Sequence, residues 1–159
     1  MPQPTTQHQH LQKMVGHWEG TLTAAMPGAP EQSVPAKEVV TAFGPFFTQS
    51  VFECNLGMPY KGTGCVGYDP LKKHYVGTWI DNMNPHLAVM EGTMDAENNT
   101  ITMRWESPDP QSGKMVPHWN VMKLEGDDGY ESTFYMGADK GTKVMTIKMK
   151  RKKEAKADK

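Results

Sequence analysis

The stretch Asp95–Gly113 (DAENNTITMRWESPDPQSG) decides the fold, because it holds one strand between two turns. Its middle alternates Ile101, Met103 and Trp105 with polar residues, and this period of two is typical of a strand with one buried face. The Asn and Asp residues before it, and the Pro, Asp and Gly residues after it, are turn formers. The stretch is therefore predicted to be one strand of a sheet that covers an apolar core on one side.

Turn signals of this kind recur along the whole chain, about every 12 to 17 residues. They lie at 56–59, 69–72, 82–85, 95–99, 108–113, 126–129 and 138–141. Strands are accordingly predicted at about 18–24, 35–43, 46–54, 62–68, 74–81, 86–94, 100–106, 114–125, 130–137 and 142–151. Short strands at regular spacing predict an antiparallel meander.

A meander of about ten strands has to protect its two edges, and closure into a barrel removes them. We therefore predict an all-β fold, a single antiparallel up-and-down β-barrel of about ten strands. A barrel of about eight to ten strands has an interior just wide enough for side chains or one small ligand. A two-sheet sandwich, which has no central cavity, is the alternative.

A short helix is predicted before the first strand. Apolar residues at positions 11, 14 and 15 have helical spacing, Thr6 is a suitable N-terminal cap, and Gly16 can end the helix. A helix this short is not stable alone, so we expect it to pack over one end of the barrel. His8 and His10 on this segment are expected to be solvated.

The composition predicts one soluble globular domain, with 159 residues of which 37% are hydrophobic and 22% charged. No apolar run approaches the roughly 20 residues of a membrane-spanning helix, and the N-terminus lacks the apolar stretch of a secretory signal. We expect a cytoplasmic protein with a flexible N-terminus at 1–5, one barrel domain at 6–151 and a basic tail at 152–159. No membrane partner is expected.

The charge is unevenly distributed, although the net charge is only −1. Residues 148–159 carry seven basic and two acidic side chains, and no aromatic residue is interleaved with them. Base stacking is therefore unavailable there, so a solvated tail is expected rather than a nucleic-acid site. The sequence leaves a homodimer open.

Two cysteines flank the predicted hairpin at 56–64. Cys54 and Cys65 could face each other across it, which would allow a cross-strand disulfide. Two free thiols are the prediction for a reducing compartment. Neither a Cys-x-x-Cys motif nor a zinc-ligand spacing is present.

The candidate site follows from the apolar residues of the predicted strands. The chain has 13 methionines, and together with Trp79, Trp105 and Trp119 the strand methionines suit a cavity for an apolar or aromatic molecule. Either face of strand 74–81 could point inward. The predicted ligand-binding residues are Trp79, Asp81, Met103, Trp105, His118 and Met145.

Non-catalytic binding of a small apolar ligand is the first hypothesis, and no cofactor is expected. His118 shares a predicted face with Asn120 and Met122, so it could orient the polar end of a ligand or bind a haem iron. Asp81 shares a face with Trp79, where its pKa would rise, so an isomerase or hydrolase that uses Asp81 or His118 is an alternative. An interaction module is a further alternative. No metal site is predicted.

One motif resembles a known superfamily. The stretch Gly16-His17-Trp18-Glu19-Gly20 resembles the calycin pattern of lipocalins and nitrobindin-like proteins. That resemblance implies a tryptophan that plugs the closed end of the barrel. A large ring fills the taper of a small barrel, and glycine lets neighbouring backbone come close.

A longer series of motifs resembles one bacterial family. The series comprises His10-Leu11, Gly16-x-Trp18-x-Gly20, residues 57–62, Gly67-Tyr68-Asp69, residues 73–83, residues 92–95 and residues 109–114. In order and spacing it is similar to domain-of-unknown-function family 1579 over most of residues 8–151. The resemblance implies a calycin-like or lipocalin-like barrel with no established activity, and it supplies no catalytic residues.

Overall fold

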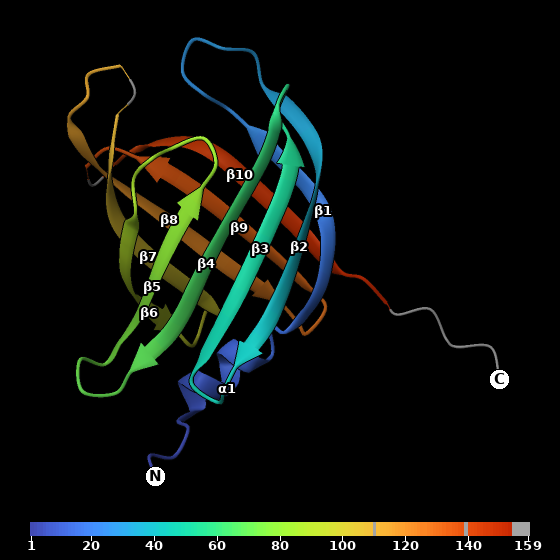
Figure 1. Ribbon diagram of the computed structural model, residues 1–159, viewed down its shortest axis with the longest axis vertical. Coiled ribbons are helices and arrows are strands. Elements are labelled where there is room, and N and C mark those ends of the chain that lie inside the picture. Colours follow the sequence, from blue (N-terminus) through green and yellow to red (C-terminus); the bar gives the residue numbers. More distant parts are fainter. Residues whose placement is uncertain (110, 139, 154–159) are drawn as a thin grey trace, which may run out of the picture.

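The chain forms a closed antiparallel β-barrel with a short helix at one end, as Figure 1 shows for the computed structural model. The structure describes residues 1–109, 111–138 and 140–153, so parts of the predicted turns at 108–113 and 138–141 and of the tail at 152–159 lie outside it. The elements are α1 (Thr6–Gln12), β1 (Gly16–Ala24), β2 (Gln32–Phe43), β3 (Phe47–Asn55), β4 (Pro59–Asp69), β5 (His74–Asp81), β6 (Ala88–Asp95), β7 (Thr100–Pro108), β8 (Met115–Glu125), β9 (Gly129–Met136) and β10 (Thr142–Arg151).

The ladder order confirms the predicted up-and-down barrel. Each strand pairs with its neighbours in sequence, and β1 pairs with β10 to close the wall. The sandwich alternative is therefore wrong. Because α1 precedes β1, the loops after β1, β3, β5, β7 and β9 gather at the end opposite the helix. We call this the open end of the barrel, and the other the helix end.

The strand β2 begins at Gln32, three residues earlier than about 35. The predicted strand starts at Pro35 itself, although a proline cannot donate a ladder hydrogen bond. In the structure Pro35 lies opposite Thr21 of β1, whereas the ladder with β3 begins only at Ala36. Pro35 therefore occupies a part of the strand that has one unpaired side, where a proline is tolerated.

Burial settles which side chains point inward. Trp18 and Leu22 of β1 are each only 2% exposed, as the alternation predicts. In β5 the sequence left both faces open, and the structure places Tyr75 inside at 1% exposure and Ile80 outside at 49%. Trp79 shares the inward face with Tyr75, because side chains two or four residues apart lie on the same face of a strand.

The helix end of the barrel is densely filled. One buried cluster joins the helix to β5 and β7 through Leu11, Tyr75, Ile101 and Met103. A second cluster comprises Trp18, Leu22, Val34, Ala36, Val40, Phe52, Tyr130, Ile147 and Met149. Most of the apolar burial that stabilises the fold is therefore found toward this end and along β1, β2 and β10.

The helix is fixed by its own cap. Thr5, rather than Thr6, is the N-cap, and it pairs with His8 three residues later in a capping box. His8 is 2% exposed, so the expectation that it is solvated is wrong. Its Nε2 donates to the carbonyl oxygen of Tyr68 at 3.0 Å, which ties α1 to β4. Among the described residues no helix is long and apolar enough to span a membrane.

Trp18 joins the helix segment to the wall. Its Nε1 donates a hydrogen bond of 2.9 Å to the carbonyl oxygen of Met14. The Arg151 guanidinium lies 4.3 Å from the ring centroid, and Tyr130 contacts the ring edge-to-face at 5.2 Å. The tryptophan therefore fills the helix end, as the Gly-x-Trp resemblance implies.

Gly20 illustrates the close approach of β1 and β10. A Cβ there would lie 1.8 Å from the carbonyl oxygen of Lys148. We expect Gly20→Ala to lower the free energy of unfolding by about 2 kcal/mol, because the strands must move apart. Urea unfolding measures this, and Gly129→Ala is the matched control, since a Cβ there meets its nearest atom at 3.4 Å. Equal stability of the two variants would contradict the packing described.

The two cysteines are free thiols, as predicted. The ladder places Cys54 opposite Tyr60 and Cys65 opposite Gln49, so the strands do not bring the two sulfurs together. Cys54 packs against the interior cluster, and burial raises the pKa of both thiols. Both are therefore poor nucleophiles at neutral pH.

Candidate ligand-binding site

The barrel wall has a slot between β6 and β7. These strands pair only from Glu91 to Asp95 against Thr100 to Arg104. In the described part of the chain, no ladder joins the residues of β6 before Glu91 to those of β7 after Arg104. The wall is therefore split toward the open end, where the two strands diverge.

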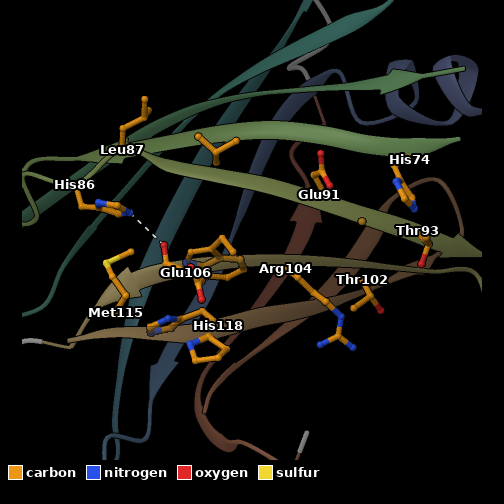
Figure 2. Close-up of a pocket in the computed structure, with 14 residues that line it drawn as sticks. His74, His86, Leu87, Glu91, Thr93, Thr102, Arg104, Glu106, Met115 and His118 are labelled. Carbon is orange, nitrogen blue, oxygen red and sulfur yellow. Dashed lines mark hydrogen bonds between the residues drawn. The ribbon is translucent and has the colours of Figure 1, made fainter. Parts of the chain in front are cut away.

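An open pocket of about 820 Å³ lies at this slot. Figure 2 shows the residues that line it. Its outer part is lined by polar residues of the outward faces, among them Glu91, Thr102 and Arg104. Its inner part includes Trp105 and His118, which belong to inward-facing rows. Most of the pocket therefore lies on the outer surface of the wall, and Trp105 and His118 reach it from the inward-facing rows.

Two side-chain bonds bridge the slot where the backbone ladder is missing. His86 Nε2 donates to the carbonyl oxygen of Glu106 at 3.1 Å (Figure 2). Asn84 Nδ2 lies 3.4 Å from Ser107 Oγ. Side-chain contacts of this kind are broken more easily than a backbone ladder, so the wall is held less firmly here than where β6 and β7 pair.

Trp105 and His118 form a stacked pair at the inner side of the slot. The register of β7 and β8 places them directly opposite each other, and their rings lie 5.7 Å apart at an interplanar angle of 17°. Trp105 also contacts Phe134 of β9 edge-to-face at 6.3 Å. The pair therefore continues into the aromatic lining of the interior.

The hydrogen bond of His118 indicates which of its ring nitrogens carries a proton. Its Nδ1 lies 3.0 Å from the carbonyl oxygen of Val116. A carbonyl oxygen only accepts, so Nδ1 carries a proton, and in the neutral form of the ring the lone pair is on Nε2. His118 can therefore accept a hydrogen bond from a ligand or donate its lone pair to a metal.

The open half of the interior is lined by large apolar side chains that keep partial solvent exposure. They are Tyr60, Trp79, Phe134 and Met145, and all of them pack against the buried cluster around Trp18. Their partial exposure leaves apolar surface on the inner face of the wall toward the open end.

Trp79 is held flat against β4. A Cβ on Gly62 or on Gly64 would lie 2.2 or 2.6 Å from the Trp79 ring, so only glycine leaves room for the indole. Trp79 Nε1 donates to Tyr60 Oη at 3.2 Å. Burial, together with the nearby charge of Asp81, raises the pKa of Tyr60 to about 12. The tyrosine therefore stays a neutral phenol in this lining.

Met103 and Asp81 are the remaining predicted site residues. Met103 is 6% exposed and packs in the cluster with Leu11 at the helix end. Asp81 lies at the open end, and its Oδ1 accepts hydrogen bonds of 2.9 Å from the backbone amides of Met83 and Asn84. Its carboxylate thus caps the turn between β5 and β6.

Trp119 is not part of the lining, contrary to the grouping with Trp79 and Trp105. It lies on the outer face of β8, where its ring stacks on Tyr135 at 5.2 Å. The Arg104 guanidinium lies 5.5 Å from its centroid. His118 and Trp119 are adjacent in sequence and so point to opposite sides of the wall.

Glu38 is an inward-facing residue that was not among the predicted site residues. It lies on β2 in the inward row with Val34, Ala36 and Val40. Its Oε2 accepts a short hydrogen bond from Tyr130 Oη, which reaches it from β9 across the interior. The sequence feature that could have identified it is a single charged residue in the otherwise apolar row of Val34, Ala36 and Val40.

Burial raises the pKa of Glu38 above its usual 4.5, against the opposing effect of the Tyr130 and Ser50 hydroxyls. A carboxyl whose pKa is higher in the folded state stabilises the fold at low pH, and this stability is lost as the pH rises through the folded pKa. We therefore expect Glu38→Gln to become more stable relative to the wild type as the pH rises from about 4 to about 8. Urea unfolding across this range measures the trend.

Glu53→Gln is the control for this trend. Glu53 is an outward carboxylate that lies 3.1 Å from Lys37 and 3.0 Å from Lys61, and these lysines lower its pKa. Its stabilising contribution is present at neutral pH and is lost on acidification, so the variant should show the opposite trend. A pH-independent effect of Glu38→Gln would contradict the buried placement of that carboxyl.

The fold and the slot define the class of protein, a closed up-and-down β-barrel with a helix over one end and an open pocket beside β6 and β7. The family model described as "Protein of unknown function (DUF1579)" matches residues 3–153, and the chain belongs to this family. The sequence resemblance is thereby confirmed.

Two solved structures have similar folds. Rv2717c from M. tuberculosis has a TM-score of 0.71 at 14% sequence identity, over 95% of this chain and 100% of that one. The S-type phycobiliprotein lyase CPES from Guillardia theta has a TM-score of 0.62 at 14% identity, over 96% of this chain and 100% of that one. Identity this low shows the fold alone. No curated protein matches the chain.

Proposed function

We propose that the protein binds a small, mostly apolar or aromatic molecule in the open half of the barrel and does not catalyse a reaction. One observation carries the proposal: the inward-facing Trp79, Trp105, Phe134 and Met145 keep partial solvent exposure toward the open end of the barrel. A ligand that covers these side chains removes their apolar surface from water. The slot between β6 and β7 offers a second route to them besides the open end.

The energetics favour a ligand with a polar end. An aromatic molecule that buries about 200 Å² of apolar surface gains about 5 kcal/mol at about 25 cal/mol/Å². Association costs consume much of this gain, so tight binding needs an additional directed contact. The free Nε2 of His118 supplies an acceptor at the inner side of the slot. We therefore assign His118 the role of orienting the ligand.

The comparisons are compatible with this function. A protein named as a phycobiliprotein lyase has the same fold, although an identity of 14% gives no information about the ligand of this chain. The free thiols Cys54 and Cys65 suit a reducing compartment, so we propose a cytoplasmic, lipocalin-like binding protein. The isomerase or hydrolase alternative through Asp81 or His118 stays a prediction.

Titration with 1-naphthylmethanol tests the proposal. We expect saturable binding of one molecule per chain, with a negative heat-capacity change from apolar burial. His118→Ala should weaken the binding about fivefold, the equivalent of a neutral hydrogen bond of about 1 kcal/mol. An absence of saturable binding would contradict the proposed function. Unchanged affinity in His118→Ala would remove only the role of that residue.

Haem binding is the second candidate, and one observation favours it. A histidine that donates Nδ1–H to a backbone carbonyl and leaves Nε2 free has the arrangement of metal-ligating histidines. Haem would supply the redox or gas-binding chemistry, and His118 would hold its iron. Haem added to the purified protein should give a Soret band that His118→Ala abolishes. A spectrum of free haem alone would rule this candidate out.

A further inference from the structure

Glu38 is the one carboxylate that the described strands direct into the apolar interior away from the loop ends. Tyr130 reaches it from β9, although β1 and β10 lie between β9 and β2 in the wall, so this contact crosses the inside of the barrel. Ser50 approaches from β3. Within the described residues, Glu38 forms no ion pair, and each of its neighbouring polar groups is an uncharged hydroxyl.

A buried carboxylate without a cation is an incomplete arrangement. Taking an ionised carboxylate out of water costs several kcal/mol unless an opposite charge compensates it. The hydroxyls of Tyr130 and Ser50 donate hydrogen bonds but carry no charge. The strongest missing interaction at this position is therefore a charge-assisted hydrogen bond from a cation.

The position of Glu38 connects it to the aromatic lining. It lies opposite Phe52 in the ladder between β2 and β3. Phe52 contacts Tyr60 edge-to-face at 6.2 Å, and Tyr60 accepts the hydrogen bond of Trp79. Glu38 is partly buried, and it lies beside Trp18, its partner in the ladder between β1 and β2. A ligand that packs on Trp79 can thus extend a polar group toward Glu38.

We propose that the ligand is an aromatic or apolar amine whose protonated nitrogen binds Glu38. This proposal rests on the proposed function, which it deepens by naming the ligand class. The ammonium group donates to the carboxylate, while the apolar body covers the aromatic side chains of the open half. The free Nε2 of His118 is also a hydrogen-bond acceptor. Glu38 and His118 therefore both suit a ligand that donates hydrogen bonds, and both disfavour a ligand that carries a carboxylate.

None of the charged groups described near Glu38 pairs with its carboxylate, so it can bind the ammonium group of a ligand. From β9 it meets Tyr130, whose pKa is raised by burial and by Glu38, so the phenol stays protonated while the carboxyl titrates. Arg151 of β10 lies over Trp18, and it is bound to Asp128 and to the carbonyl oxygens of Lys13, Val15 and Asp127. We expect amine binding to strengthen as the pH rises through the pKa of Glu38, because only the ionised carboxyl attracts the cation.

The test compares two ligands that differ only at their polar end. The probes are 1-naphthylmethylamine, which is protonated at neutral pH, and 1-naphthylmethanol, which is neutral. Calorimetry on the full chain should show that the amine binds about tenfold more tightly than the alcohol. In Glu38→Gln the two affinities should become equal. Tyr130→Phe, which keeps the carboxylate, and Glu53→Gln, which removes an outward one, should both retain the preference.

The outcomes separate this inference from the function on which it rests. Saturable binding of both naphthalenes without a preference for the amine would overturn the amine proposal and leave the binding function intact. A preference that persists in Glu38→Gln would overturn it as well. If neither probe binds, the proposed function fails and the amine proposal fails with it. Circular dichroism of Glu38→Gln and Tyr130→Phe confirms that each variant is folded.

Discussion

Replacing Trp18 with alanine is expected to lower the free energy of unfolding by about 3–5 kcal/mol, as for other large-to-small changes in a core. The side chain is 2% exposed, and the change removes the indole from the centre of the larger buried cluster. It also removes the hydrogen bond to Met14 and leaves the Arg151 guanidinium without its aromatic partner. The helix segment then loses its main attachment to β1.

Urea unfolding measures the free energy of unfolding of Trp18→Ala, and two control variants show which contacts of Trp18 account for its decrease. Trp18→Phe keeps an aromatic ring but not the Nε1 donor, so it should cost clearly less than the alanine variant. Trp119→Ala removes a tryptophan from the outer face, where its ring stacks on Tyr135, and should cost about 1 kcal/mol. Similar losses for Trp18→Ala and Trp119→Ala would contradict the central position of Trp18.

Trp105→Ala is expected to weaken the binding of 1-naphthylmethanol about tenfold or more. The variant removes a ring that stacks on His118 and contacts Phe134, so a ligand in the open half loses both apolar area and an aromatic contact. It also widens the inner side of the slot and frees His118 to change its orientation. Fluorescence titration of the naphthalene measures the affinity.

Trp119→Ala is the matched control for this measurement as well. Trp119 follows His118 in the same strand but points to solvent, beside Arg104. We expect its removal to change the affinity less than about twofold, because the residue does not touch the interior. Equal losses in Trp105→Ala and Trp119→Ala would place the bound ligand on the outer face and contradict an interior site.

The fold was largely predictable from the sequence, because its main determinants are local. Turn residues indicate where the backbone reverses direction. The alternation of Ile101, Met103 and Trp105 with polar residues indicates which side chains point into the barrel. Both properties are determined within a few residues of sequence. The faces of β5 were not predictable, because both rows carry apolar residues. Only the packing of Tyr75 against the helix residue Leu11 decides which row is buried.

Long-range features escaped the sequence analysis. His8 is buried because Tyr68, sixty positions later, supplies a carbonyl oxygen for its ring. The slot depends on where the ladder between β6 and β7 stops, which no local pattern reports. Of the predicted site residues, Trp79, Trp105, His118 and Met145 lie in the open half, Asp81 caps a turn at the open end and Met103 packs at the helix end. Their part in binding a ligand stays a prediction.

Glu38 was missed for a different reason. A charged residue in a strand is usually taken as outward, and Glu38 follows the outward Lys37 directly. Its place in the row of Val34, Ala36 and Val40 breaks the apolar pattern of the inner face. A break in a local rule of this kind often marks a functional position rather than a structural one.

Crystals grown with 4-bromo-1-naphthylmethanol test the central claim most directly, because the anomalous signal of bromine locates the ligand independently of any fitted structure. The account predicts one bromine site inside the barrel, in the open half between Trp105, Phe134 and Met145. Bromine sites confined to the outer surface, with side chains closing the interior around Trp79, would contradict it.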